Sequence, residues 1–256
     1  MYFPGGIQFY EGDILVKTLN SEREKVEGYK LRHKVFSDGL KWVESTVDGL
    51  ERDGYDSWAT SVGLFLKGGR LSGIFRLLPT KGPFMLEKEF LSLLQPNYVL
   101  RKMKDTVEIT RLTVDPYIPD KGLSSRMMQI LFKGVYQWSV QNDVRYLYMV
   151  IEKRFFRVFR AMGFPCEPLG PCKAFPPARV LSVAAILDLD HFRSVSRRKR
   201  PWLLGWISSV EKRNNDELGE YRRWSAETPT HHSGTTDFCG RNLVEEENYR
   251  NTLARV

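Results

Sequence analysis

The chain has 256 residues, 42% of them hydrophobic, which suffices for one buried core at the length where single domains begin to divide. No run of roughly eighteen apolar residues occurs, so we expect no transmembrane helix, and the segment Met1 to Gly12 has no basic residue, so it does not resemble a secretory signal. The net charge of +8 and the isoelectric point of about 9.3 favour an anionic partner, and composition leaves open whether it is nucleic acid, an acidic carrier protein or a phosphate-rich cofactor.

The cysteines and histidines give little support to disulfide or metal chemistry. Three cysteines (Cys166, Cys172 and Cys239) cannot all pair within one chain, and their spacing matches no zinc motif. Of the four histidines, His231 and His232 fall in a polar tail. We therefore expect a reduced, cytoplasmic protein without a metal centre.

The N-terminal part predicts a strand, a capped helix and a long loop. Residues Ile14–Leu19 are strand-like, and Ser21 with Glu24 forms the capping-box pattern of a helix that runs to about Phe36. The stretch Ser37–Asp56 is polar, contains three glycines and has no clean period. Because long loops in compact domains are usually functional or disordered, and this one contains aromatic residues, we interpret it as a structured loop.

A hairpin and a series of alternating elements follow. Two strand-like runs, Ser57–Lys67 and Arg70–Pro79, meet at Gly68-Gly69, a dipeptide typical of hairpin turns. The elements expected after them are a short helix over Leu86–Leu94, a strand over Thr106–Val114, a helix over Leu123–Gln141, a strand over Tyr146–Ile151, a helix over Phe155–Met162 and a strand over Val180–Leu189.

This order of elements predicts an α/β fold with a mixed sheet and helices on its faces. The main domain is expected over residues 1–190. From about Phe192 the hydrophobic period is lost and most residues are polar or charged. Residues 191–256 are therefore interpreted as a C-terminal extension, partly helical or irregular, with a short segment that carries Trp202 and Trp206.

The first group of residues with chemical potential lies in the early helix and loop. Arg32 and Phe36 are four positions apart and share a helix face, and Trp42, Asp53 and Asp56 follow within 25 positions. Aromatic faces can hold a sulfonium or an adenine ring, a carboxylate can hold an ammonium group, and an arginine can bind a carboxylate through two hydrogen bonds. The alternative is a surface salt-bridge network beside two buried rings, which periodicity alone favours.

Two strands carry charged residues that need an explanation. Arg76 lies in the apolar run Gly73–Leu78, where burial requires a carboxylate partner or a ligand, and an outward-facing side chain is the equal alternative. In the strand Thr106–Val114, alternation places Glu108 and Arg111 on opposite faces, so only a bulge or a twisted end would present them together. A strand carboxylate in a cleft can act as a general base, and the alternative is an edge-strand ion pair.

Two helices carry basic residues. The helix start at Asp120–Arg126 offers free backbone N–H groups and basic side chains to a phosphate, although such starts are common. A later helix has an apolar face of phenylalanines that leaves four cations outside, which favours an anionic partner over simple solvation. The four cations are Lys153, Arg154, Arg157 and Arg160.

In their order and spacing, five segments resemble the Lux-type acyl-homoserine lactone synthases, the autoinducer synthases of bacterial quorum sensing. The resemblance covers roughly Ile14–Leu189, and it is specific because five separate motifs agree. The segments are Leu31–Phe36 with Trp42, Asp53–Asp56, Gly73–Leu86, Glu108–Arg111 and Gln141–Asp143.

The resemblance implies a GNAT-like fold, a three-layer α-β-α sandwich whose mixed central sheet is split into a V-shaped cleft. It also implies the reaction: an acyl group on acyl carrier protein or coenzyme A passes to the amine of S-adenosylmethionine, and lactone closure releases methylthioadenosine. Because these molecules are substrates, we expect no cofactor, and we expect neither nucleic acid nor a membrane as a partner. The main alternative is a GNAT-like N-acyltransferase that uses acyl-coenzyme A on another amine.

The resemblance also assigns roles. Glu108, Asp53 and Arg76 are the expected catalytic residues, with Glu108 as the general base, directly or through water, and Asp53 on the amine. Arg111 or Arg32 is expected to hold the carboxylate, and aromatic rings are expected to line the adenosyl-sulfonium pocket. The expected S-adenosylmethionine site comprises Arg32, Phe36, Trp42, Asp53, Asp56 and Arg111.

Acyl recognition is expected at further positions. Some family members carry threonines linked to 3-oxo chains where this chain has Met149 and Ile151, which favours an unsubstituted chain here. The stretch Glu167–Gly170 resembles members that use coenzyme A thioesters, whereas the basic helix suits an acidic carrier protein, the donor that we favour. The expected acyl or pantetheine positions are Met149, Ile151, Lys121 and Ser124, and the expected carrier-docking positions are Lys153, Arg154, Arg157 and Arg160.

Overall fold

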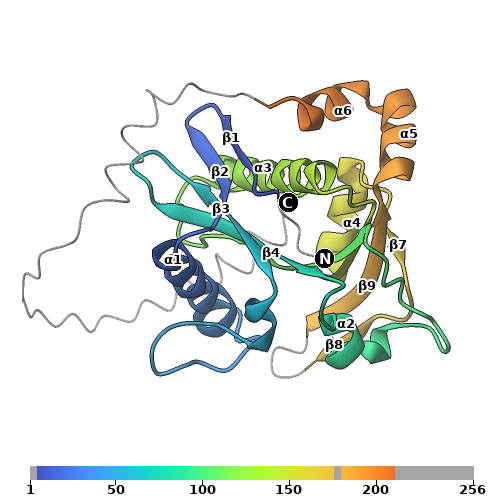
Figure 1. Ribbon diagram of the computed structural model, residues 1–256, viewed down its shortest axis with the longest axis horizontal. Coiled ribbons are helices and arrows are strands. Elements are labelled where there is room, and N and C mark those ends of the chain that lie inside the picture. Colours follow the sequence, from blue (N-terminus) through green and yellow to red (C-terminus); the bar gives the residue numbers. More distant parts are fainter. Residues whose placement is uncertain (1–4, 176–179, 211–256) are drawn as a thin grey trace, which may run out of the picture.

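A computed structural model describes residues 5–175 and 180–210, and its centre is a nine-stranded mixed sheet (Figure 1). The strand order is β1-β2-β3-β4-β5-β6-β9-β7, and β8 also pairs with β9. All paired strands are antiparallel except β5 and β6, which are parallel. The strands are β1 (Gln8–Glu11), β2 (Ile14–Thr18), β3 (Thr60–Phe65), β4 (Leu71–Pro79), β5 (Thr106–Val114), β6 (Tyr146–Glu152), β7 (Glu167–Pro168), β8 (Lys173–Phe175) and β9 (Val180–Asp188).

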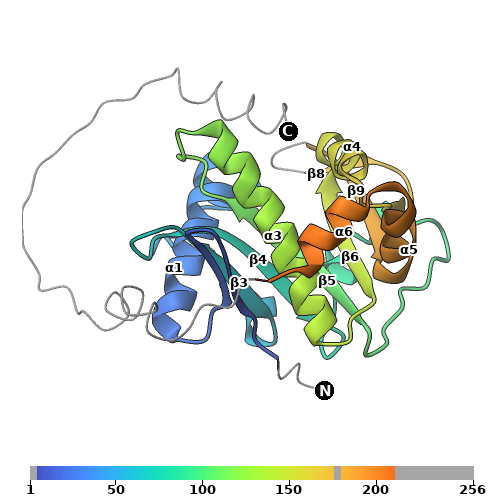
Figure 2. The ribbon, with the colours of Figure 1, turned by 90° about the horizontal axis from the view of Figure 1, so that it is seen from above.

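Helices cover both faces of this sheet, so the molecule has the three layers that the sequence predicts (Figures 1 and 2). On one face α1 (Glu22–Arg32) packs against β3 and β4. On the other face α3 (Lys121–Gln141) packs against β2 to β5, and α4 (Lys153–Met162) packs against β6 and β9. No helix among the described residues is both long and apolar enough to cross a bilayer.

Strands β5 and β6 separate part-way along their length. Their parallel pairing ends where Ile109 lies opposite Met149. Beyond that pair β5 continues to Val114 and β6 continues to Glu152, and β6 stays paired with β9 on its other side. The separation splits the sheet into the V that the family resemblance implies.

The first part of the predicted C-terminal extension, residues 191–208, is largely helical and packs into the main core. It lies in α5 (Leu189–Lys199) and α6 (Pro201–Ser208), and both helices supply side chains to the cluster between the sheet and α3. Phe192 and Ile207 are fully buried, and the Trp206 indole N–H donates to Glu11 at 2.9 Å. In α5 basic and polar residues surround the apolar positions and conceal the helical period in the sequence, whereas α6 is a short and mostly apolar segment. The rest of the expected extension, 211–256, lies outside the described residues.

Two local predictions near the N-terminus are confirmed. Ser21 and Glu24 form the reciprocal capping box at the start of α1. Gly68 and Gly69 form the turn between β3 and β4, and their φ angles of 82° and 79° suit glycine. The predicted helix runs beyond Phe36, because α1 continues into a π-helical segment, η1 (His33–Gly39).

Several short elements were not predicted. The helix expected over Leu86–Leu94 is two pieces, α2 (Met85–Lys88) and a 3-10 turn, η3 (Leu91–Leu93). The long loop ends in another 3-10 turn, η2 (Gly54–Ser57), and β1, β7 and β8 have four residues or fewer. Segments this short contain too few positions to show a hydrophobic period.

Candidate active site

A bulge in β5 brings Arg111 to the face that carries Glu108. The register between β4 and β5 slips by one residue beyond Ile74, so two residues of β5 oppose one of β4. Arg111 has a φ of 53°, which is uncommon for a residue other than glycine. Both side chains then meet Met85, whose amide donates to Glu108 at 2.6 Å and whose sulfur lies 3.8 Å from Arg111 Nη1. Of the two predicted alternatives, a bulge or a twisted strand end, the structure has the bulge.

Three arginines and three carboxylates form one ionic network on this face. Arg76 Nη1 donates to Asp53 at 2.6 Å and to Asp56 at 2.9 Å, and its Nε donates to Thr110 at 2.9 Å. Of the two alternatives for Arg76, burial with carboxylate partners is therefore the correct one. The network consists of Arg32, Arg76, Arg111, Glu51, Asp53 and Asp56.

Glu51 is the network member that sequence reasoning missed. It accepts hydrogen bonds from Arg32 Nε and, at 2.7 Å, from Arg111 Nη2, so it joins helix α1 to the bulge of β5. Burial alone would raise the pKa of Glu51, but the hydrogen bonds and charges of the two arginines lower it to about 2. Its position two residues before Asp53 is the only signal in the sequence, and the surrounding polar loop conceals it.

Burial divides the network into an inner and an outer part. The side chains of Arg32 and Arg76 are 0% exposed, whereas those of Asp53 and Arg111 are 25% and 13% exposed. Each of the three nitrogens of Arg32 donates to a carboxylate of the network, two to Asp56 and one to Glu51. Arg32 is therefore buried among its own partners, whereas Arg111 is partly exposed and lines the cavities.

Glu108 lies fully buried beside this network. Its two oxygens accept hydrogen bonds from the backbone N–H groups of Met85 and Leu86, at 2.6 and 3.1 Å, at the start of α2. Burial raises the pKa of Glu108 to about 8, although these two hydrogen bonds and the charge of Arg76 act in the opposite direction. The carboxyl group can therefore exchange a proton near neutral pH.

A cavity of about 180 Å³ opens on the Glu108 side of the V. Phe36 and Trp42 line it together with Glu108 and Arg111. The centroids of the two aromatic rings are 6.0 Å apart, and the Arg111 guanidinium lies 5.4 Å from the Phe36 centroid. An aromatic wall beside paired charges is suited to a ligand that combines an apolar ring with a zwitterion.

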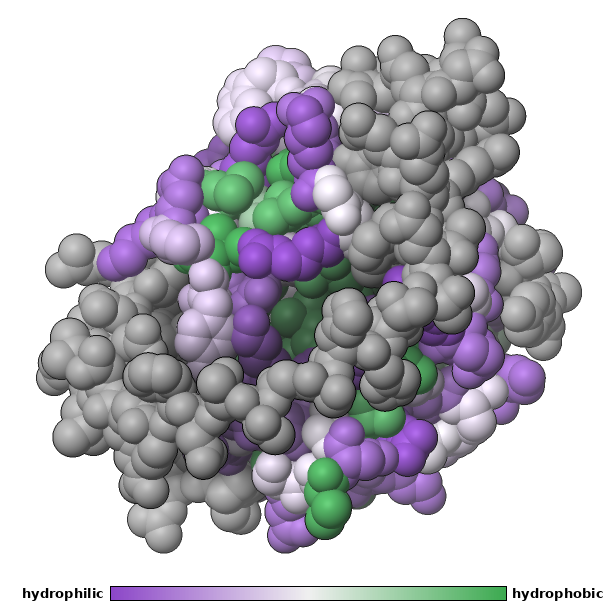
Figure 3. Space-filling view, turned by 90° about the vertical axis from the view of Figure 1, so that its left-hand side faces the viewer, coloured by the Kyte–Doolittle hydropathy of each residue, from purple (hydrophilic) through white to green (hydrophobic). Residues whose placement is uncertain are grey.

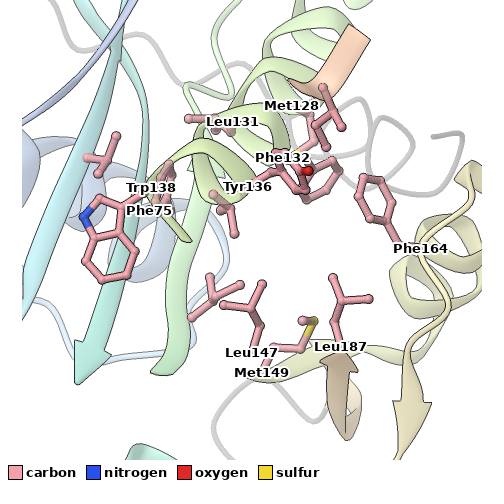
Figure 4. Close-up of a cluster of buried hydrophobic side chains, with 14 of the residues drawn as sticks. Phe75, Met128, Leu131, Phe132, Tyr136, Trp138, Leu147, Met149, Phe164 and Leu187 are labelled. Carbon is pink, nitrogen blue, oxygen red and sulfur yellow. The ribbon is translucent and has the colours of Figure 1, made fainter. Parts of the chain in front are cut away.

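A second cavity, of about 160 Å³, lies on the other side of the V, where α3 and α4 cover the sheet. Its lining is mainly apolar, and in Figure 4 side chains of α3 such as Phe132 face Leu147, Met149 and Leu187 across an open space. In Figure 3 one face of the molecule is hollowed, with hydrophobic side chains at the floor and hydrophilic ones at the rim. The two cavities meet at the mouth of the V, where they share Phe36, Trp42, Ile109, Thr110, Arg111, Val150, Ile151 and Glu152.

The other expected positions are placed as follows. Met149 and Ile151 line the apolar cavity, whereas Lys121 and Ser124 line neither of the two cavities. The start of α3 is already capped, because Asp120 accepts the Leu123 N–H at 3.1 Å. On α4 the side chains of three of the predicted cations are exposed and Lys153 is half-buried; the exposed three are Arg154, Arg157 and Arg160.

Solved structures share this architecture. The AHL synthase LasI superposes with a TM-score of 0.60 at 22% identity, over 70% of this chain and 91% of that chain. The coenzyme A-dependent acyl-homoserine lactone synthase BjaI superposes with a TM-score of 0.61 at 22% identity, over 80% of this chain and 92% of that chain. These likenesses establish the GNAT-like fold.

Sequence comparison goes further. An acyl-homoserine-lactone synthase of Agrobacterium fabrum is 32% identical over 166 residues, which are 63% of this chain and 77% of that relative. One of Vibrio anguillarum is 33% identical over 164 residues, which are 63% of this chain and 84% of that relative. The autoinducer synthase profile matches residues 17–195. The chain therefore belongs to the autoinducer synthase family, the acyltransferases that make acyl-homoserine lactone signals.

Proposed function

We propose that this chain transfers an acyl group from a thioester to the amine of S-adenosylmethionine and then closes the product to an acyl-homoserine lactone. In the first step the amine nitrogen bonds to the thioester carbonyl carbon, and the thiol leaves with the proton that the nitrogen loses. In the second step a carboxylate oxygen of the acylated intermediate bonds to the γ-carbon of the methionine chain, which is attached to the sulfonium. The carbon–sulfur bond breaks, and methylthioadenosine leaves with its electron pair.

One observation carries this proposal: the ionic network meets both cavities at Arg111, and the neighbouring Asp53 is partly exposed. Asp53 Oδ2 and Arg111 Nη2 lie 3.3 Å apart. A zwitterion bound between these two side chains would replace their ion pair with two contacts. Its ammonium group would lie on Asp53 and its carboxylate on Arg111. Arg76, which is fully buried, then acts as a positioning residue that holds Asp53.

We assign the proton transfer to Glu108. A free α-amine has a pKa of about 8, and that of Glu108 is also about 8, so a proton passes between them at little cost in free energy. Since Glu108 is fully buried, the proposed transfer runs through a water molecule. The two backbone N–H groups of Met85 and Leu86 fix the carboxyl group in the required orientation.

The acyl chain is assigned to the apolar cavity beneath α3, and the donor to a carrier protein that docks on the basic face of α4. Exposed arginines on α4 lie directly after Glu152 at the mouth of the V, where the thioester must enter. The acyl-homoserine lactone synthase BjaI has been solved with S-adenosylmethionine and isopentyl-coenzyme A, and TofI with methylthioadenosine, which supports the same two substrate classes here. The reaction needs no cofactor, and we place it in the cytoplasm.

The test is to incubate the purified chain with S-adenosylmethionine and a panel of acyl-carrier-protein and acyl-coenzyme A thioesters and to identify the products by mass spectrometry. The proposal expects an acyl-homoserine lactone and methylthioadenosine in equal amounts, from carrier-protein donors in preference to coenzyme A donors. Acyl transfer to another amine without methylthioadenosine would support the GNAT-like N-acyltransferase instead. Failure to consume any thioester would overturn the catalytic assignment.

A further inference from the structure

Glu152 is a carboxylate in the site that the mechanism does not use. It ends β6, directly before α4, and lines both cavities at the mouth of the V. It occupies the N-cap position of α4 but makes no side-chain capping hydrogen bond. Within residues 5–175 and 180–210 no hydrogen bond or ion pair engages its carboxylate, and the charge of Arg154 is its nearest electrostatic influence.

The alternation of β6 places Glu152 on the S-adenosylmethionine side of the sheet. Leu147 and Met149 pack into the core under α3, whereas Tyr148 and Val150 pack on the opposite face with α2. Glu152 continues this second set, which also faces the cavity that contains Glu108. Its cross-strand neighbour on β9, Ser182, lines the same cavity.

Glu152 and the group assigned to the substrate carboxylate lie on opposite arms of the V. Glu108 is paired with Tyr148, so Arg111, three residues further along β5, and Glu152, four residues further along β6, stand at nearly the same level. The two strands separate beyond Ile109 and Met149, and both residues line the cavities at the mouth between them. An S-adenosylmethionine anchored at Asp53 and Arg111 therefore brings its nucleoside to Glu152 when it extends across the mouth of the V.

A carboxylate only accepts hydrogen bonds when ionised, and its two oxygens match two neighbouring donors. The adjacent 2′- and 3′-hydroxyl groups of a ribose are such a pair. Aromatic side chains stand near Glu152 for the base, because Phe90 and Phe175 line the same cavity and contact edge-to-face with centroids 5.2 Å apart. Burial raises the pKa of Glu152, which is consistent with a carboxyl group that is partly removed from water and lacks a partner.

We propose that Glu152 binds the ribose diol of S-adenosylmethionine and thereby selects the adenosyl group. This inference rests on the proposed function, because it takes S-adenosylmethionine as the ligand of the Asp53 and Arg111 edge. It adds a second anchor at the far end of the same molecule. The two anchors together fix the sulfonium between them, above the aromatic wall of Phe36 and Trp42.

Methylthioadenosine isolates this contact, because it has the ribose and the base but neither the amine nor the carboxylate. We would titrate methylthioadenosine and its 2′-deoxy and 3′-deoxy analogues into the wild-type chain, Glu152→Leu and Glu152→Gln by calorimetry. Glu167→Leu is the matched control, because Glu167 is an exposed carboxylate on the edge strand β7 and lines neither cavity of the V.

The wild-type chain and the Glu167→Leu control should bind methylthioadenosine at least about 10-fold more tightly than either deoxy analogue, which is about 1.4 kcal/mol. Glu152→Leu should bind all three within about twofold of one another, and Glu152→Gln should retain part of the preference. Unchanged discrimination in Glu152→Leu would overturn the inference. Weakened binding of S-adenosylmethionine with unchanged binding of methylthioadenosine would also overturn it, since Glu152 would then interact with the charged groups of S-adenosylmethionine and not with the ribose. If the wild-type chain bound neither ligand, the proposed function itself would fail.

Discussion

The Glu51 carboxylate lies 2.7 Å from Arg111 Nη2 and is the strongest link between that arginine and the buried network. Through Arg32, which also donates to Glu51, the contact fixes helix α1 to the bulged strand β5. The orientation of the partly exposed Arg111 guanidinium therefore depends on a carboxylate that no substrate needs to touch.

The substitution Glu51→Gln should lower the free energy of unfolding by ~3–5 kcal/mol at pH 7, because it leaves buried guanidinium groups without their partner. The pKa of Glu51 is about 2 in the folded chain against an ordinary value of 4.5, so its contribution to stability is present above pH 4.5 and is lost as the pH falls towards 2. Urea unfolding at pH 7 and at pH 3 measures this. Glu44→Gln, at an exposed loop position, should change stability by less than about 0.5 kcal/mol; equal effects from both variants would contradict the role of Glu51.

The substitution Glu108→Gln should reduce kcat by about 100-fold or more while KM for S-adenosylmethionine changes little, because the variant keeps the side-chain shape but removes the proposed proton acceptor. Stability supplies an independent measurement. The folded-state pKa of Glu108, about 8, exceeds its ordinary value of 4.5, so the stability of wild type relative to the variant is greatest below pH 4.5 and falls as the pH rises through 8. A constant difference between pH 4 and pH 9 would show that Glu108 does not titrate as proposed.

The preferred acyl chain should change with the volume of the apolar cavity. Leu187 and Phe164 both line it (Figure 4). Leu187→Phe fills space and should shift the preferred chain to shorter acids, whereas Phe164→Leu opens space and should shift it to longer ones. Ratios of kcat/KM across a series of acyl thioesters measure the shift. If both variants shifted in the same direction, the effect would reflect instability rather than the fit of the chain.

The basic face of α4 should matter only for a large acidic donor. Arg157→Glu should lower kcat/KM for an acyl-carrier-protein thioester by about 10-fold, and the loss should diminish at high salt. The same variant should use an uncharged pantetheine thioester as well as wild type does. Lys104→Glu makes an equal charge change at another exposed position and should leave both reactions unchanged. Equal losses of kcat/KM with both donors would show that the Arg157 substitution acts through the general stability of the fold.

Much of the fold was predictable because the hydrophobic residues of its longer elements repeat with the period of a helix or a strand. The capping box at Ser21, the turn at Gly68-Gly69 and the apolar stripe of α3 are local signals, and each produced the expected element. The packing of the helices after residue 189 was missed because the buried Phe192 and Ser196 of α5 lie among basic and polar residues, and because the apolar α6 has only eight residues. Their burial depends on contact with α3 and Glu11, which is a tertiary effect that a single sequence does not display.

The candidate site was predictable in composition but not in geometry. The motif residues identified Asp53, Asp56 and Arg76 as a group, and the structure joins them. Periodicity does not reveal which of the charged residues are buried, so the contacts of Arg32 with Glu51 and Asp56 and the part played by Glu51 became visible only in the folded chain.

The most direct test of the whole account is the affinity of S-adenosylmethionine, measured by calorimetry for wild type, Asp53→Asn and the exposed control Asp143→Asn. The account predicts that Asp53→Asn weakens S-adenosylmethionine binding by about 10-fold or more, because the ammonium loses a charge-assisted partner, and leaves methylthioadenosine binding within about twofold. The control should match wild type for both ligands. Equal affinity of wild type and Asp53→Asn for S-adenosylmethionine would contradict the assignment of the Asp53 and Arg111 edge to the substrate zwitterion.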